Sequence, residues 1–189
     1  NELTSIPASI GELQALTTLI LRENNIEELP ASLWDLEALQ RLALSQNEIT
    51  DIPEELQNLK ELTYLNLSFN EFNEVSAIPE SISALTKLSA LDLAGNPNMD
   101  TLPSQIGNLS NLQYLNLNNN TNQNELLENI FKLTKLRRLK LKNCGLSCLP
   151  SSISQLNKLD TLILVGNEFK ELPEEVGLLK NLLYLDLSF

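Results

Sequence analysis

The sequence predicts an α/β fold: a right-handed, curved solenoid of about eight repeats over residues 1–189, with one parallel sheet on its concave face and short helical or turn segments on its convex face. Three observations support this prediction. Leucine supplies 44 of the 189 residues, and the segment Leu-x-x-Leu-x-Leu-x-x-Asn recurs every 23 to 26 residues. Seven of the eight prolines also occupy one slot of this repeat. The copies begin at Leu16, Leu39, Leu62, Leu88, Leu112, Leu136 and Leu159, with a shorter copy at Leu182.

The middle of each copy predicts a short β-strand. Successive side chains of a strand point to opposite faces, so Leu65 and Leu67 face the core and Asn66 faces outward. Stacked copies form a parallel sheet, and connections between parallel strands are right-handed. Because one repeat cannot bury its own leucines, the neighbouring repeats must complete the core.

The proline slot marks the segment that returns from one strand to the next. Proline has no backbone N–H and cannot lie within a strand ladder, so we expect it to begin a turn or a short helix. Trp34 follows one of these prolines and is predicted to pack on the convex side. The slot holds Pro7, Pro30, Pro53, Pro79, Pro103, Pro150 and Pro173.

The ninth position of the repeat, counted from its first leucine, predicts a ladder of buried side chains. A buried amide must find hydrogen-bond partners, so we expect each side chain to bond to loop backbone of its own repeat and of the next. The ladder positions are Asn24, Asn47, Asn70, Asn96, Asn120, Cys144 and Asn167.

Three copies depart from 23 residues. The third carries three extra residues within 70–78, the fourth one extra residue around 96–100, and the fifth replaces Leu-Pro in residues 124–127. Insertions in a solenoid emerge as loops.

Neither end of the array shows a cap, so we expect the array to belong to a longer protein.

These motifs resemble those of leucine-rich repeat proteins over essentially the whole chain. The 23-residue form with Leu-Pro-x-x-Ile, as in residues 102–106, is similar to the intracellular Ras-group and scaffold repeats of eukaryotes. It is equally similar to bacterial leucine-rich repeat proteins, including secreted effectors. The resemblance implies a horseshoe-shaped solenoid that binds other proteins, and it implies that cysteine is tolerated in the ladder.

The composition argues against most catalytic chemistry. The chain has no histidine, which excludes histidine-based triads and most zinc or non-haem iron sites. Asp92 and Asp186 face outward four strands apart, about 19 Å by sheet spacing, which is too far for a two-carboxylate mechanism. The sequence contains neither a phosphate-binding glycine loop nor an apolar run of 18 residues. We therefore expect no enzymatic activity, catalytic residue, cofactor, metal site or membrane span.

The two cysteines, Cys144 and Cys148, predict neither a disulfide framework nor a zinc site, because they face no second pair. Both are expected to be small, buried or half-buried residues. Cys144 fills a ladder position, and we interpret it as a structural residue rather than a reactive thiol.

The outward strand positions predict a binding surface. Six of the thirteen basic residues lie within residues 132–142, and three of them alternate along one strand as a basic stripe beside a tyrosine. Aromatic and arginine side chains dominate binding hot spots, and a basic stripe suits an acidic partner. The alternative is a solvated strand balanced by the acidic half of the molecule. The candidate partner-binding residues are Tyr64, Tyr114, Asn116, Arg138, Lys140 and Lys142.

We interpret the chain as a monomeric, non-enzymatic module that binds another protein on its concave face. Nucleic acid is not expected as a partner, because a net charge of −12 repels phosphate. Two alternatives stay open. One is the recognition part of a larger enzyme, such as a ligase or kinase, or of a bacterial effector; the other is a structural or adhesive surface protein. The expected compartment is the cytoplasm, or a host cell if the protein is a bacterial effector.

Overall fold

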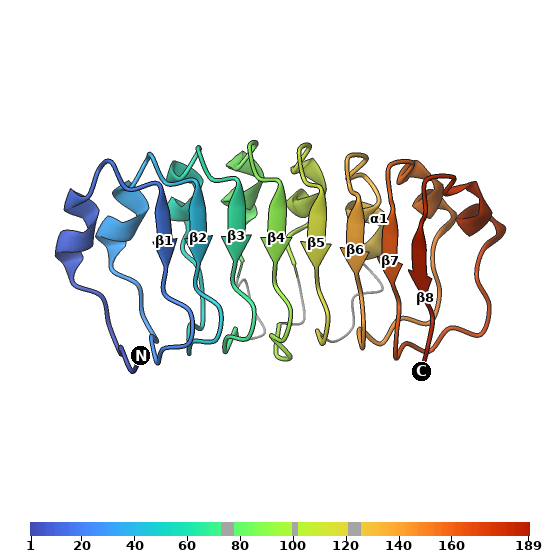
Figure 1. Cartoon of the computed structure of the whole chain (residues 1–189), viewed down its shortest axis with the longest axis horizontal. Helices are drawn as coiled ribbons and strands as arrows, with labels where there is room; N and C mark the ends of the chain where they lie inside the picture. The colour runs from blue at the N-terminus through green and yellow to red at the C-terminus, as the bar shows by residue number, and fades with distance from the viewer. Residues whose placement is uncertain (73–77, 100–101, 121–125) are drawn as a thin grey trace.

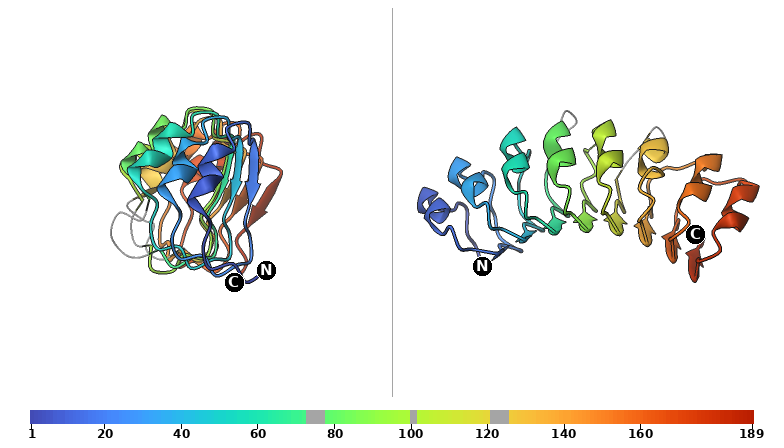
Figure 2. Two further views of the ribbon diagram at one scale, coloured as in Figure 1. Left: turned by 90° about the vertical axis from the view of Figure 1, so that its left-hand side faces the viewer. Right: turned by 90° about the horizontal axis from the view of Figure 1, so that it is seen from above.

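Eight parallel strands form one sheet in chain order in the computed structural model, which describes residues 1–72, 78–99, 102–120 and 126–189 (Figure 1). The sheet lines the inner side of an arc and the helical segments lie on the outer side (Figure 2). The predicted solenoid with a concave parallel sheet is confirmed. The strands are β1 (Thr18–Ile20), β2 (Arg41–Ala43), β3 (Tyr64–Asn66), β4 (Ala90–Asp92), β5 (Tyr114–Asn116), β6 (Arg138–Lys140), β7 (Thr161–Ile163) and β8 (Tyr184–Asp186).

The repeat period sets the register of the sheet. The same slot of each repeat pairs with the same slot of the next, from Thr18 opposite Arg41 to Thr161 opposite Tyr184. The middle residue of each strand from β2 to β7, such as Leu115 in β5, is fully buried. The residues on either side of it face the concave surface. Each strand therefore gives one leucine to the core and two side chains to the concave face.

Short helices form the convex side, and the proline slot begins all but one of them. The proline carbonyl accepts the first hydrogen bond of the helix, as from the N–H of Ile106 to Pro103 at 3.0 Å. The prediction for this slot is confirmed, as is the packing of Trp34, which is buried. The 3₁₀ helices are η1 (Ala8–Glu12), η2 (Ala31–Asp35), η3 (Glu54–Asn58), η4 (Glu80–Ala84), η5 (Ser104–Asn108), η7 (Ser151–Gln155) and η8 (Glu174–Leu178). The fifth repeat lacks the proline and has a short α-helix instead, α1 (Leu127–Ile130).

The predicted insertions fall largely beyond the part of the chain that the structure describes. Residues 73–77 of the third repeat, residue 100 of the fourth and residues 124–125 of the fifth are outside it. Nearby, Phe72 and Phe131 are fully buried in the core. Among the described residues, no helix is long and apolar enough to cross a membrane.

The eighth position of the repeat has a left-handed backbone in each of the first seven copies. This conformation favours glycine, yet glycine fills the slot only at Gly95 and Gly166. A bulky residue such as Phe69 adopts it at a cost and must be held there by its surroundings. The ladder residue follows immediately, so this slot turns the chain off the strand toward the ladder. The other non-glycine residues in the slot are Glu23, Gln46, Asn119 and Asn143.

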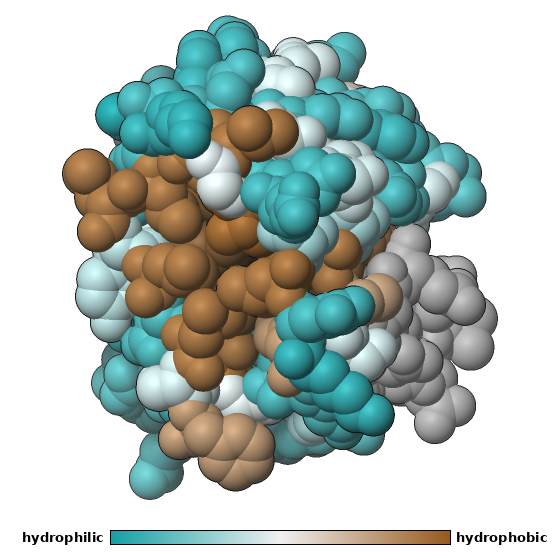
Figure 3. Space-filling view, turned by 90° about the vertical axis from the view of Figure 1, so that its right-hand side faces the viewer, coloured by the Kyte–Doolittle hydropathy of each residue, from teal (hydrophilic) through white to brown (hydrophobic). Residues whose placement is uncertain are grey.

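The end face of the eighth repeat is apolar. Leu187 and Phe189 are exposed there, and Figure 3 shows apolar side chains gathered over this end of the molecule. The strand leucine Leu185 is 39% exposed, whereas the equivalent Leu162 of the seventh repeat is fully buried. The core of each repeat therefore depends on the repeat that follows it.

Candidate binding surface on the concave face

Strands β5 and β6 bring four of the six candidate contact residues together. Tyr114 lies opposite Arg138, and Asn116 lies opposite Lys140, in adjacent parallel strands. Lys142 follows β6 by two residues and is exposed, as is Arg138. The basic stripe therefore lies beside Tyr114 of the neighbouring strand, because equivalent positions of adjacent repeats pair in the sheet.

Two cations of the stripe flank the ring of Tyr114. The Cζ atom of Arg138 lies 5.3 Å from the ring centroid and the Nζ atom of Lys140 lies 5.5 Å from it. A cation at this distance is attracted by the π-electrons of the ring. The pair of contacts holds both cations close to the aromatic surface that the concave face offers to a partner.

Tyr114 is itself held by an acidic neighbour in β4. Its hydroxyl donates to Oδ2 of Asp92 at 3.3 Å, and Nδ2 of Asn116 donates to the same oxygen at 3.1 Å. Burial, together with the Asp92 carboxylate, raises the pKa of Tyr114 to about 12, so the phenol stays a donor at neutral pH. Asn116 is only 8% exposed. It supports the tyrosine and offers little of its own surface.

Tyr64 lies in the same column as Tyr114, two strands away. Ala90 of β4 lies between the two tyrosines in the register, which places them about 10 Å apart by sheet spacing. The guanidinium of Arg41 stacks on the Tyr64 ring at 3.6 Å from its centroid, and Nδ2 of Asn66 donates to the Tyr64 hydroxyl at 3.3 Å. Tyr64 is thus a second half-buried aromatic with its own cation, separate from the Tyr114 cluster.

A side-chain turn that the sequence analysis missed supports the concave face. In four repeats an Asn or Asp at the end of the strand accepts a hydrogen bond from the backbone N–H two residues later, as at Asn66 from Ser68 (2.9 Å). Such bonds are typical of Asn and Asp. The signal was available, since Asn or Asp recurs in this slot. The other three pairs are Asp92 with Ala94, Asn116 with Asn118, and Asp186 with Ser188.

The ladder side chains bond the turns of adjacent repeats together. Nδ2 of Asn47 donates to the carbonyls of Leu21 (3.0 Å) and Leu44 (2.9 Å), and its Oδ1 accepts from the N–H of Ile26 at 3.2 Å. Asn70, Asn96 and Asn167 each bridge two leucine carbonyls of this kind in the same way. Asn120 donates to the carbonyl of Leu93 in the preceding repeat. Asn24, in the first copy, donates to Leu21 of its own repeat and accepts from Leu3.

The ladder was predicted correctly in part. We expected bonds to the residue's own repeat and to the next one. The bonds to its own repeat are present, as from Asn47 to Leu44, but the second partner lies in the preceding repeat, as from Asn47 back to Leu21. Main-chain hydrogen bonds between adjacent repeats also continue past the strand, as from the N–H of Glu23 to the carbonyl of Ser45 at 3.0 Å. The ladder amides add to these bonds.

Cys144 completes the ladder with a weaker donor. Its Sγ lies 3.2 Å from the carbonyl oxygen of Leu117, and its N–H donates to Oδ1 of Asn167 at 3.0 Å. Burial raises the pKa of the Cys144 thiol to about 11.

Cys148, in contrast, is exposed, so its predicted burial was wrong. It fills the slot before Leu-Pro or Ile-Pro, which holds Glu28, Asp51 and Glu171 in other repeats, and that slot faces solvent.

The two thiols should therefore react very differently. At pH 8 a thiol-specific disulfide reagent should label Cys148 within minutes, and Cys144 only on unfolding. Cys144 is buried, and its raised pKa leaves almost no thiolate at pH 8. Mass spectrometry of the native protein should find one label per chain, and of the urea-unfolded protein two. Rapid native labelling of Cys144 would show that the ladder is open at this repeat.

In the part of the chain that the structure describes, no three Cys, Asp or Glu side chains are grouped so as to hold a metal ion. The concave face instead offers half-buried aromatic rings with cations beside them. These features define a class: a curved repeat solenoid with a mixed aromatic and basic surface on its sheet.

The chain belongs to the leucine-rich repeat proteins. Family models described as leucine-rich repeats match residues 1–49 and 14–72, residues 61–85 and 87–109, and, as a leucine-rich repeat region, residues 114–188. Comparison with curated proteins gave no match. Leucine-rich repeats commonly serve as protein-binding modules.

Solved structures of the same architecture come from bacteria and plants. A leucine-rich repeat protein of Leptospira interrogans is 32% identical over 100% of this chain and 53% of its own, with a TM-score of 0.74. A plant peptide hormone receptor, RGFR1 in complex with RGF2, is 29% identical over 98% of this chain and 30% of its own, with a TM-score of 0.81. The functional domain of InlJ from Listeria monocytogenes shares the fold at 23% identity, over 100% of this chain and 37% of its own, with a TM-score of 0.79. The chain thus spans about half or less of each of these proteins.

Proposed function

We propose that this chain is a non-enzymatic module that binds an acidic partner protein through the concave face of β3 to β6. The contact surface consists of Tyr64, Tyr114, Arg138, Lys140 and Lys142, with Asn116 as a supporting residue. The observation that carries the proposal is the pair of cations beside the half-buried Tyr114 ring. An aromatic anchor beside positive charge is the composition of a binding hot spot for an acidic surface.

The surroundings of this cluster favour a preformed surface. Oδ2 of Asp92 accepts both from the tyrosine hydroxyl and from Nδ2 of Asn116, and Lys142 donates its backbone N–H to Oδ1 of Asn118 at 2.8 Å. Side chains that are already fixed lose less conformational freedom on binding. The solved receptor in complex with RGF2 shows that a related solenoid binds another molecule, and it supports a binding role here.

Charge reversal on β6 should abolish most of the binding. For a partner obtained by affinity capture, Arg138→Glu with Lys140→Glu should raise the Kd at least tenfold, about 1.4 kcal/mol. The side chains lie on the concave surface and contribute little to the core, so the melting temperature should stay within about 2 °C. Biolayer interferometry and circular dichroism measure the two quantities.

The matched control reverses two charges on the convex side. Glu54→Lys with Glu55→Lys changes the first turn of η3 and should leave the Kd within twofold. If this pair abolishes binding while the β6 pair does not, the partner uses the convex side and the proposed site is wrong.

The module could serve as the recognition part of a larger enzyme or effector through the same surface. This second candidate is kept because the similar Leptospira protein is longer, and this chain covers only 53% of it. Both roles predict the same loss of binding in the β6 variant. A catalytic domain joined to the module would then lose activity toward the captured partner, but not toward a small generic substrate.

A further inference from the structure

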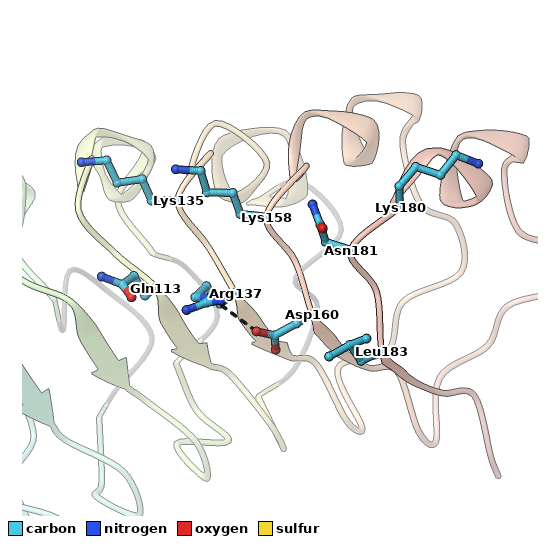
Figure 4. A pocket seen from close by; sticks show the side chains of 8 residues that line it. All are labelled: Gln113, Lys135, Arg137, Lys158, Asp160, Lys180, Asn181 and Leu183. Atoms are coloured by element: carbon cyan, nitrogen blue, oxygen red, sulfur yellow. Dashed lines mark ion pairs between the residues drawn. The ribbon is translucent and has the colours of Figure 1, made fainter.

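A second basic site lies outside the concave surface, at the edge of the sheet where the chain enters strands β5 to β8. A hollow of about 610 Å³ opens there. Lys135, Lys158 and Lys180 come from the segments that precede β6, β7 and β8, and Arg137 immediately precedes β6. Figure 4 shows the three lysines in a row along this edge, above the paired side chains of Arg137 and Asp160. We call these four cations the rim cluster.

The rim cluster carries more positive charge than the described residues around it neutralise. Among these residues, Asp160 is the one acidic side chain that lines the hollow, and its Oδ2 lies 3.4 Å from Nε of Arg137. Two of the three lysines have neutral partners: Nζ of Lys135 donates to Oδ1 of Asn111 and Nζ of Lys180 to the carbonyl of Gly177, both at 2.6 Å. Four positive charges against one negative leave a balance of +3 in a chain whose net charge is −12.

The shape of the rim cluster suits an extended anionic chain. It runs across three repeats, from the segment before β6 to the segment before β8. This is a span of about 10 Å by strand spacing, which an extended peptide covers with about three residues at about 3.3 Å each. The side chain of Arg137 is 61% exposed, so the cations line an open hollow rather than a closed cavity. An open row of flexible lysines lacks the fixed, inward-facing donors that hold a compact ligand.

The rim cluster is continuous with the proposed contact surface. Arg137 lies on the edge and Arg138, the next residue, lies on the concave face beside Tyr114. A partner bound to the concave stripe therefore has a second basic site within a few residues of it. We propose that the rim cluster binds an extended run of carboxylates, an acidic segment of three or more residues that belongs to the partner. This inference rests on the proposed function for the identity of the partner, but not for the anion site itself.

The site can be tested without the partner. The probe is fluorescein-labelled hexaglutamate, its binding measured by fluorescence anisotropy in 20 mM NaCl. Lys135→Glu with Lys158→Glu should raise the Kd at least tenfold. The control is Lys60→Glu with Lys87→Glu, which changes the net charge by the same amount as the first variant. These two lysines lie on the same edge of the sheet, before β3 and β4, and Lys87 forms an ion pair with Glu61 at 2.6 Å. The control should change the Kd less than twofold, and equal losses in both variants would show a general charge effect and overturn the site.

Acetylation of the wild-type protein gives a second readout that needs no variant. Hexaglutamate should protect Lys135, Lys158 and Lys180 from acetic anhydride while Lys60 and Lys87 react unchanged. Protection confined to Lys140 and Lys142 would place the anion on the concave stripe. The same conclusion follows if Arg138→Glu with Lys140→Glu abolishes hexaglutamate binding while the rim variant, Lys135→Glu with Lys158→Glu, does not. In either case this inference fails and the proposed function stands.

Three further outcomes would overturn the proposal. Absence of hexaglutamate binding up to 1 mM peptide leaves no anion site. Tripolyphosphate binding more than tenfold tighter than hexaglutamate would identify a compact polyphosphate as the ligand. Sedimentation that shows self-association of the wild type, lost in the rim variant, would make the acidic half of a second copy the occupant.

Discussion

Asn96→Ala should lower the free energy of unfolding by about 3 kcal/mol, because it leaves a buried N–H without a partner. Asn96 is fully buried, and its Oδ1 accepts from the N–H of Asn70 at 2.9 Å. The two carbonyls that receive its amide each keep another donor: Leu67 retains Asn70, and Leu93 retains Asn120. The Asn70 N–H has no such replacement. Urea unfolding followed by circular dichroism measures the loss.

An exposed asparagine provides the control for this substitution. Asn157→Ala removes a side chain from the end of a return segment and leaves its backbone carbonyl, which accepts from Asn181. Its effect should stay within about 0.5 kcal/mol. A loss below 1 kcal/mol in Asn96→Ala would show that water enters the ladder and replaces the amide.

Leu162→Ala should cost about 3 kcal/mol, the usual effect of removing a fully buried leucine from a core that cannot collapse around the gap. Leu162 is the middle residue of β7 and is completely buried. Its neighbours are fixed by the repeats on both sides, so relaxation is limited. Denaturant unfolding at constant temperature measures this difference.

The adjacent residue offers an internal comparison. Ile163 is the next residue of the same strand, but faces the concave surface and is partly exposed. Ile163→Ala removes as many side-chain carbons as Leu162→Ala. It should nevertheless cost about 1 kcal/mol or less, because those carbons are already partly in water in the folded protein. Equal costs at the two positions would contradict the assignment of inward and outward faces.

The repeat period made most of the fold predictable. Because the same slot pairs with the same slot, the positions of Leu65, Asn66 and the prolines were enough to place the strands, their register and the return helices. The left-handed turn at the eighth position also left a trace in the sequence, since Gly95 and Gly166 share that slot. Five bulkier residues fill it elsewhere, and their conformation is set by the fold rather than by their own preference.

The candidate surface was less predictable, for two physical reasons. The positions in the repeat predicted which residues lie beside Tyr114. They did not predict that Asn116 donates a hydrogen bond to Asp92 and is buried. The rim cluster escaped notice because Lys135, Lys158 and Lys180 precede the strands, and the outward columns of the strands do not include them. Long lysine side chains also reach across several ångströms, so sequence slots alone do not show where their charges converge.

The stacking of the strands in chain order gives the molecule an electric polarity. Residues 1–100 carry 4 basic and 17 acidic residues, a balance of −13, and residues 101–189 carry 9 and 8, a balance of +1. Distance along the chain becomes distance along the long axis, so the molecule is a dipole with its positive pole toward β6 to β8. The net charge of −12 repels an acidic partner as a whole, but the repulsion is weakest at this pole, so the partner is oriented toward it during diffusional approach. Added salt should weaken this orientation as it shortens the Debye length from about 30 Å at 0.01 M to about 8 Å at 0.15 M.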